Sequence, residues 1–190
     1  GEVDMDGLFI AGGVAVAIIL YIVTVYNGLV RSKNQVESAW SQIDVQLKRR
    51  HDLIPNLVEV TKDAMDYEQE TLTAVVEARA KAVSAKDGSR EGAIAAEGLL
   101  SSAMGKLLAV FENYPDLKAN QNISDLTEEL SSTENRIAFS RQHYNDSVNQ
   151  QNVRVESFPS NIVAGSFGFR HAVYFAVDEA EKEPVKVDLR

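Results

Sequence analysis

The chain has 190 residues, 45% of them hydrophobic, which is enough to bury one sizeable core, so one domain plus any appendage is expected. Its 19 basic residues against 28 acidic ones give a net charge of −9, which repels polyphosphates, so no nucleic acid partner is expected. The absence of cysteine excludes disulfides, thiolate zinc sites and thiol nucleophiles.

The first element is an uncharged stretch over residues 8–26, LFIAGGVAVAIILYIVTVY. As a helix it would extend about 28 Å, close to the ~30 Å hydrocarbon core of a bilayer. A signal peptide is the alternative, but its apolar region is shorter and follows positive charges, whereas Glu2, Asp4 and Asp6 precede this stretch. The sequence therefore predicts a transmembrane helix over 8–26, after a short external N-terminus over 1–7.

The orientation of this helix follows from the basic residues around it. None precedes the stretch, whereas Arg31 and Lys33 follow it. Because cytoplasmic flanks carry the excess of Lys and Arg, the N-terminus is expected outside and the bulk of the chain in the cytoplasm. Tyr21 and Tyr26 suit an aromatic belt near the cytoplasmic interface.

The next element predicted is a long helix that continues from the membrane. Its apolar stripe has helical spacings of three, four and seven, and includes Val36, Trp40, Ile43, Leu47, Ile54, Leu57 or Val58, Thr61, Met65, Leu72, and Val75 or Val76. If one helix reached about Ser84, it would extend roughly 90 Å. Pro55 lies within it, so we expect a kink; the alternative is a break, with Asp52 as the N-cap of a new helix.

Two further helices follow a turn at AKDGSREG, residues 85–92. The second helix is predicted from about Arg90 to Tyr114, where Pro115 ends it. A polar connection, PDLKANQNIS, then leads to a third helix over about 125–156, with Ser124 or Asn122 as its cap.

The third helix carries a regular stripe, and three of its nine members are polar. The stripe comprises Leu126, Leu130, Thr133, Ile137, Ser140, Tyr144, Val148, Gln151 and Val155. Polar groups at such core positions need hydrogen-bond partners, which favours a defined register. Phe139 lies off the stripe and suggests a second contact surface, either within the chain or with a neighbouring protomer.

The C-terminal part differs in character. Residues 157–175, SFPSNIVAGSFGFRHAVYF, are predicted to form a loop or short irregular element with an apolar side. If the three helices alternate in direction, away from the membrane, toward it and away again, this segment lies far from the membrane. If the second and third helices both run back toward the membrane, the segment touches the bilayer. The sequence leaves both arrangements open. Residues 171–190 are expected to form an acidic tail, flexible or extended over its last part, 178–190.

A charged cluster, Lys48, Arg49, Arg50, His51 and Asp52, is the first candidate for chemistry. It could bind phosphate, or His51 and Asp52 could belong to a metal phosphohydrolase. Such an enzyme needs further ligands, and only His143 and His171 remain as histidines. The interpretation favoured by the sequence is a solvated helical face, whose long basic side chains lie along apolar neighbours.

Other catalytic and metal motifs do not appear. A di-iron bundle needs Glu-x-x-His, but Lys48 and Ser140 precede His51 and His143 by three positions. His143 and Asp146 lie one turn apart without a third ligand. The stretch MGKLL lacks the first P-loop glycine, and AGSFGF is not a nucleophile elbow. We therefore expect no enzyme, and assign no catalytic, cofactor-binding or metal-binding residue.

Acidic residues cluster around the connection between the second and third helices, at Glu112, Asp116, Asp125, Glu128, Glu129 and Glu134. Some are ordinary for the first turn of a helix. The others could complement the basic residues 48–50, either within the bundle or between protomers. The second alternative would suit head-to-tail assembly.

Two sequence blocks resemble the LemA family of bacterial membrane proteins. They are YNGLVRSKNQVESAWSQIDVQLKRRHDLIPNLVEVTK and VFENYPDLKANQNISDLTEELSSTENRIAFSRQHYNDSVNQQNVRVESFPSNIVAGSFGFR, and the resemblance extends over residues 26–170. It implies an all-helical domain behind one N-terminal transmembrane helix, and no known activity or cofactor. Two positions depart from the usual pattern: Tyr67 replaces a frequent histidine and Gln151 a frequent aromatic residue.

Together these observations predict an all-α protein: a transmembrane helix that continues into an antiparallel up-and-down bundle of three to four helices over 27–170. We expect a scaffold in the bacterial inner membrane that contacts the lipid bilayer, forms homo-oligomers or docks membrane or cytoplasmic proteins, and uses no cofactor. The alternative is a regulatory adaptor in which the Pro55 kink moves; an enzyme with an unrecognised site is a third hypothesis.

Overall fold

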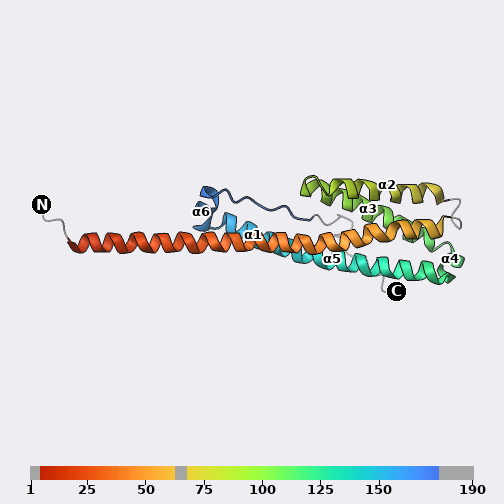
Figure 1. Cartoon of the computed structure of the whole chain (residues 1–190), viewed down its shortest axis with the longest axis horizontal. Coiled ribbons are helices and arrows are strands. Elements are labelled where there is room, and N and C mark those ends of the chain that lie inside the picture. Colours follow the sequence, from red (N-terminus) through yellow and green to blue (C-terminus); the bar gives the residue numbers. More distant parts are fainter. Residues whose placement is uncertain (1–4, 63–67, 176–190) are drawn as a thin grey trace, which may run out of the picture. The chain divides into compact units, whose positions relative to one another are not determined.

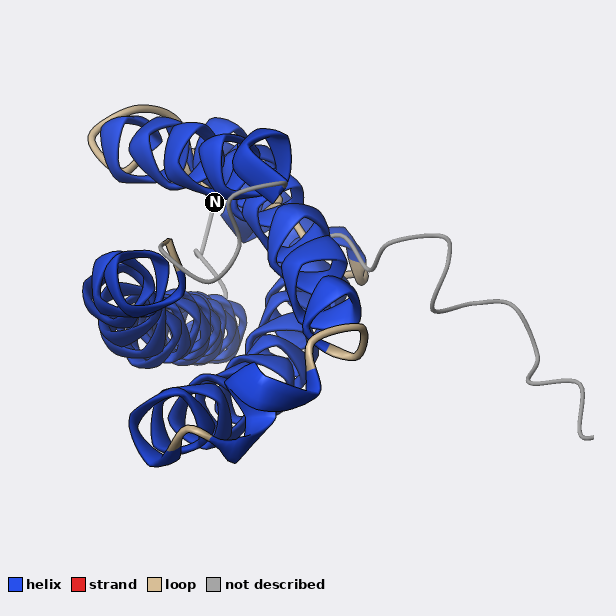
Figure 2. Cartoon of the chain, turned by 90° about the vertical axis from the view of Figure 1, so that its right-hand side faces the viewer, coloured by secondary structure: helices blue, strands red, loops and turns tan. Residues whose placement is uncertain are grey.

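The computed structural model describes residues 5–62 and 68–175. The elements are α1 (Met5–Thr61), α2 (Gln69–Ala85), α3 (Arg90–Phe111), α4 (Pro115–Ala119), α5 (Gln121–Glu156) and α6 (Ser160–Ser166). These described ranges contain helices and loops and no strand (Figures 1 and 2). The predicted all-α class is confirmed.

The chain divides into two compact units. Of the described residues, the first unit combines 5–41 with 143–174, and the second combines 42–62 and 68–142 with Phe175. Both α1 and α5 pass from one unit into the other, so each unit contains part of these two long helices.

In the first unit, α1 and α5 run antiparallel. The guanidinium of Arg154 donates to the carbonyl oxygen of Gly28 at 2.6 Å. Further along α1, the rings of Trp40 and Tyr144 meet edge to face with centroids 5.5 Å apart. As the contacts move forward along α1, from Gly28 to Trp40, they move backward along α5, from Arg154 to Tyr144, so the two helices are antiparallel.

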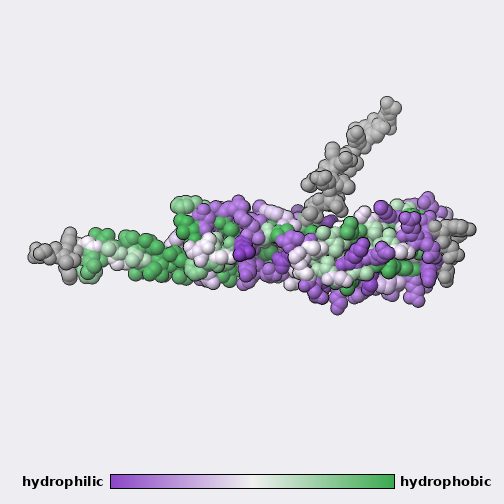
Figure 3. Space-filling model, turned by 90° about the horizontal axis from the view of Figure 1, so that it is seen from above, coloured by the Kyte–Doolittle hydropathy of each residue, from purple (hydrophilic) through white to green (hydrophobic). Residues whose placement is uncertain are grey.

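The N-terminal part of α1 is apolar and uncovered. Its most apolar 18-residue window has a mean hydropathy of 2.7, and none of this window is buried within the chain. Figure 3 shows the hydrophobic side chains covering this part of the helix. α3 is also long and apolar enough to cross a membrane, with a mean hydropathy of 1.4, but a third of its window is buried. The exposed stretch of α1 is the feature expected of a membrane protein.

In the second unit, α2 runs back along the end of α1. Lys86 contacts Asp44 at 2.9 Å, and the Nε of Arg79 donates to the carbonyl oxygen of His51 at 2.6 Å. The predicted continuous helix to Ser84 is therefore wrong, because α1 ends at Thr61 and α2 begins at Gln69. The reversal puts Leu57 and Val75 in one core, which a straight helix could not do. Met65 and Tyr67 lie outside the described residues.

The core of the second unit is built from helical stripes. α2 contributes Leu72, Val75, Ala78 and Ala82, at spacings of three and four. The buried side of α3 comprises Ala93, Ile94, Ala96, Glu97, Leu100, Met104, Leu107 and Phe111. Glu97 is the one carboxylate in that set, among apolar neighbours.

The helix boundaries after the turn differ partly from expectation. α3 begins at Arg90, and the side chain of Ser89 accepts the Gly92 N–H at 3.1 Å, as an N-cap does. The connection predicted after Pro115 is the short helix α4, with Pro115 at its start, where a missing N–H costs nothing. α5 begins at Gln121, so the predicted caps Ser124 and Asn122 lie inside it. Asn120 Oδ1 instead accepts the Asn122 N–H at 3.0 Å.

The predicted stripe of α5 is confirmed, since all nine members are buried or half-buried. Two of the polar members have partners. Thr133 donates to the carbonyl oxygen of Glu129 at 2.8 Å, and Gln151 donates to that of Arg170 at 3.1 Å.

The C-terminal segment returns along the first unit. The predicted irregular element contains a short helix, α6, after which Gly168 adopts φ 71°, a left-handed conformation that glycine tolerates. Asn152 then exchanges two hydrogen bonds with the backbone of Ala172, at 3.0 and 2.8 Å. Tyr144 donates to the carbonyl oxygen of Val173 at 2.7 Å. The acidic tail from residue 176 lies outside the described residues.

Candidate functional site

The charged cluster of α1 is divided between solvent and core. Lys48, Arg49 and Asp52 are exposed, whereas Arg50 is 0% and His51 8% exposed. The helix period explains this difference, because Arg50 continues the buried stripe of Ile43, Leu47, Ile54 and Leu57 at steps of three and four. The predicted solvated face is therefore wrong for Arg50 and His51.

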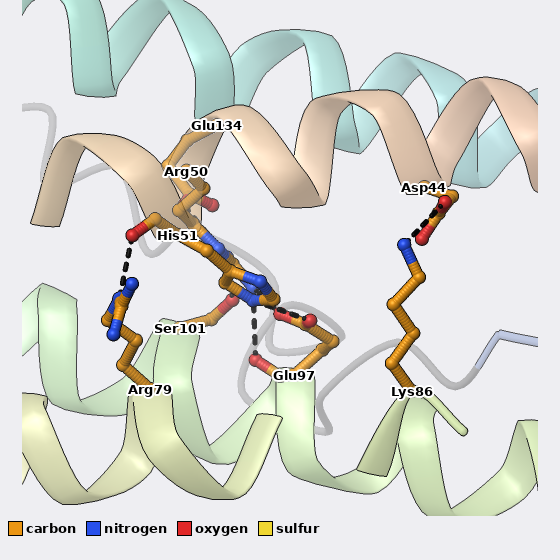
Figure 4. A network of polar contacts seen from close by, with 8 residues as sticks. All are labelled: Asp44, Arg50, His51, Arg79, Lys86, Glu97, Ser101 and Glu134. Atoms are coloured by element: carbon orange, nitrogen blue, oxygen red, sulfur yellow. Dashed lines mark hydrogen bonds and ion pairs between the residues drawn. The ribbon is translucent and has the colours of Figure 1, made fainter. Parts of the chain in front are cut away.

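Arg50 is the centre of a network that joins α1, α3 and α5 (Figure 4). Its Nη1 donates to Ser101 Oγ and to Glu134 Oε1, each at 2.8 Å. Its Nη2 forms an ion pair with Glu97 Oε2, and His51 Nε2 lies 2.8 Å from the other carboxylate oxygen of Glu97. One arginine thus neutralises Glu97 and contacts a second carboxylate, Glu134.

The environment of Glu97 favours its charged form. Burial alone raises the pKa of this carboxyl group. The close contact with His51, the charges of Arg50 and His51, and the hydrogen bond from Arg50 together outweigh the burial and hold the pKa of Glu97 below its ordinary value. The carboxylate is therefore a stable anionic centre for the network.

Pro55 is linked to the same region through the backbone. Because proline has no N–H, the carbonyl oxygen of His51, four residues earlier, loses its helical partner. The Nε–H of Arg79 on α2 occupies this oxygen at 2.6 Å. α1 continues past Pro55 to Thr61, so the alternative of a break capped by Asp52 is wrong. A side chain from the neighbouring helix thus replaces the missing backbone bond.

Two further pairs surround the network on the surface. Arg49 contacts Glu129 at 2.5 Å, and Lys86 contacts Asp44 at 2.9 Å, with all four side chains partly exposed. Glu129 and Glu134 are two of the acidic residues expected to complement the basic cluster. Both find their partners within this chain, so the within-bundle alternative holds for Arg49 and Arg50.

The centre of the network is closed to solvent. A histidine beside a carboxylate can transfer a proton, but the side chains of Arg50 and Glu97 are only 1% and 5% exposed, which leaves no room for a substrate. Over residues 5–62 and 68–175, no three His, Cys, Asp or Glu side chains converge to hold a metal. His143 and Asp146 are exposed on α5.

The sequence interpretation did not identify Glu97 or Arg79. A signal for Glu97 was present, because it lies on the apolar stripe of α3 with Ala93, Leu100 and Met104. A lone acid on such a stripe indicates a buried basic partner. Arg79 offered no comparable signal, since its contact is with a backbone oxygen that only the reversal after α1 brings near.

Comparison with known proteins places the chain in a family. Residues 39–189 match the model of the LemA family. Two magnetosome proteins of Paramagnetospirillum magneticum, MamQ 1 and MamQ 2, are each 26% identical to the chain, over 90% of it and 71% of their own length. Protein LemA of Metamycoplasma hominis is 28% identical over 84% of the chain and 72% of its own length. Because the family model matches residues 39–189, most of the chain, this protein belongs to the LemA family.

Proposed function

We propose that this protein is a non-enzymatic scaffold, anchored in the bacterial inner membrane by the N-terminal part of α1. The observation that carries the proposal is the apolar stretch of α1, uncovered by the chain and long enough to cross a bilayer. The same helix continues into the polar bundle, so the anchor and the bundle are joined without a linker. Arg31 and Lys33 after the stretch favour a cytoplasmic bundle.

The non-enzymatic part of the proposal is supported by the buried network. The side chains of Arg50, His51 and Glu97 face one another and are enclosed, which suits the fixing of helix register rather than catalysis. The adaptor alternative needs a movable element at Pro55, and the Arg79 contact with the His51 carbonyl argues against it. The net charge of −9 argues against a nucleic acid partner.

Self-association is proposed to use the surface around Phe139 on α5. This side chain is 76% exposed, and it borders a shallow hollow lined also by Gln46, Ser132, Asn135 and Arg136. Anchoring confines the protomers to two dimensions and raises their effective concentration, so a modest apolar contact can suffice. The same surface could instead receive a membrane or cytoplasmic protein.

The test is the mass and shape of the full chain extracted in mild detergent, measured by light scattering and electron microscopy. Large, uniform assemblies are expected. Phe139→Ser should reduce their mass, whereas Leu99→Ser, a matched change at a residue 61% exposed on α3, should not. A monomer or simple dimer that persists after reconstitution in lipid would refute self-assembly. Recovery of the chain in the soluble fraction would refute the anchor.

A further inference from the structure

The segment around α6 has one covered side and one uncovered apolar side. Val163 and Ala164 are buried and form a cluster with Leu29 of α1. On the other side, Phe158, Ile162 and Phe167 are 80%, 60% and 58% exposed. Three large apolar side chains so close together in the sequence and so exposed are unusual for a surface that faces only water.

This segment lies beside the end of the apolar stretch of α1 (Figure 1). The ring of Tyr26 meets that of Phe167 edge to face, with centroids 4.9 Å apart, and that of Phe169 at 5.7 Å. Tyr26 is the last residue of the apolar stretch over 8–26, and the first charged residue after it is Arg31. The aromatic cluster is therefore at the level where an inserted α1 would leave the hydrocarbon, which is where aromatic residues gather in membrane proteins.

The charges of the same unit suit a lipid headgroup layer. Arg31, Lys33, Arg154 and Arg170 are exposed on α1, on α5 and after α6. Arg154 also donates to the carbonyl oxygen of Gly28, which ties this basic side chain to the first turns after the apolar stretch. The nearby acid Glu156 pairs with His171 at 3.1 Å. Basic side chains beside exposed apolar ones are typical of segments that lie in an anionic interface.

We propose that residues 158–167 form a second contact with the bilayer, in which Phe158, Ile162 and Phe167 enter the boundary between headgroups and acyl chains. The inference rests on the proposed anchoring by α1. A bilayer is favoured over another protein because the patch is continuous with the end of the anchor, through Tyr26. The antiparallel course of α5 brings this C-terminal segment back to the membrane, the arrangement the sequence left open.

The test uses the full chain, reconstituted in vesicles of phosphatidylcholine and phosphatidylglycerol. Because the chain contains no cysteine, single cysteines can carry a nitroxide spin label without other changes. Ile162→Cys probes the proposed contact and Ile18→Cys probes the anchor. Asp146→Cys is the water-facing control, because Asp146 is exposed on α5 and lies far from the end of the anchor. Its neighbour Tyr144 contacts Trp40, and Trp40 lies about 21 Å along α1 from Tyr26. Circular dichroism checks that each variant keeps its helix content.

The readout is the ratio of label accessibility to oxygen, which partitions into lipid, and to a water-soluble nickel chelate. The proposal expects a ratio at position 162 several-fold above that at 146 and below that at 18. A ratio at 162 equal to that at 146, with 18 deep in the bilayer, would overturn the contact and leave the anchor standing. If an immobilised label at 162 were inaccessible to both reagents, protein would cover the apolar side of residues 158–167. That result would also overturn the proposed bilayer contact. A water-like label at 18 would refute the anchor itself.

Discussion

Removal of Arg50 tests whether the buried network holds the second unit together. In Arg50→Met the apolar chain keeps much of the arginine volume, but Glu97 loses its guanidinium partner while its side chain stays 5% exposed. Loss of one partner of a buried ion pair costs about 3–5 kcal/mol, because the remaining charge stays unsolvated. Glu134 contributes less, since it is 34% exposed and can reach water.

The neighbouring residue supplies a matched control. Arg49 pairs with Glu129, but the two side chains are 48% and 42% exposed, so Arg49→Met should cost about 0–1 kcal/mol. At about 2–4 °C per kcal/mol for a chain of this size, Arg50→Met should lower the melting temperature by roughly 10 °C and Arg49→Met by at most a few degrees.

The assay is thermal unfolding of the full chain in mild detergent, followed by circular dichroism. Arg50→Met combined with Glu97→Met should recover much of the lost stability, because no buried carboxylate then remains beside the missing arginine. If Arg50→Met melted no lower than Arg49→Met, or if the double variant were worse than the single one, the assignment of the network as a stabilising pair would be wrong.

Three further predictions concern separate contacts. Because the pKa of Glu97 is lowered on folding, the stability that this carboxylate contributes is complete above the ordinary pKa of an unfolded glutamate and is lost as the pH falls through the lowered value. Melting curves from pH 7 to pH 3 should therefore depend less on pH in Glu97→Gln. An unchanged dependence would contradict this account. Arg79→Met should lower the free energy of unfolding by about 1–3 kcal/mol, because it leaves the His51 carbonyl oxygen unpaired. The loss should be markedly smaller in a Pro55→Ala background, where the N–H of residue 55 can donate to that oxygen. Equal losses in the two backgrounds, measured by denaturation, would show that Arg79 does not replace the missing backbone bond. Asn152→Ala should speed amide hydrogen exchange at Ala172, because it removes the acceptor of that N–H, whereas Gln150→Ala, a change at an exposed residue, should not. Equal exchange rates in the two variants would show that the Asn152 side chain does not hold the segment around Ala172.

The sequence by itself determined the helical class, the exposed apolar stretch at 8–26 and the buried stripe of α5, because each depends on local periodicity and composition. Leu130, Ile137 and Tyr144 lie on one face whatever packs against them. The turn at 85–92 was also predictable, since Gly88 and the cap residue Ser89 act on their own backbone.

Only the tertiary structure decided where the chain reverses and which buried charges pair with one another. The apolar spacing through Ile54, Leu57, Leu72 and Val75 is the same for one long helix and for a helical hairpin, so the periodicity could not reveal the end of α1 at Thr61. The stripe of α1 places Arg50 on its buried side, but the carboxylate that pairs with it, Glu97, comes from α3. Likewise, the composition of residues 158–175 suits either end of a bundle, and the contact of Phe167 with Tyr26 exists only because α5 runs back along α1. These features depend on pairing between distant segments, which a local pattern does not encode.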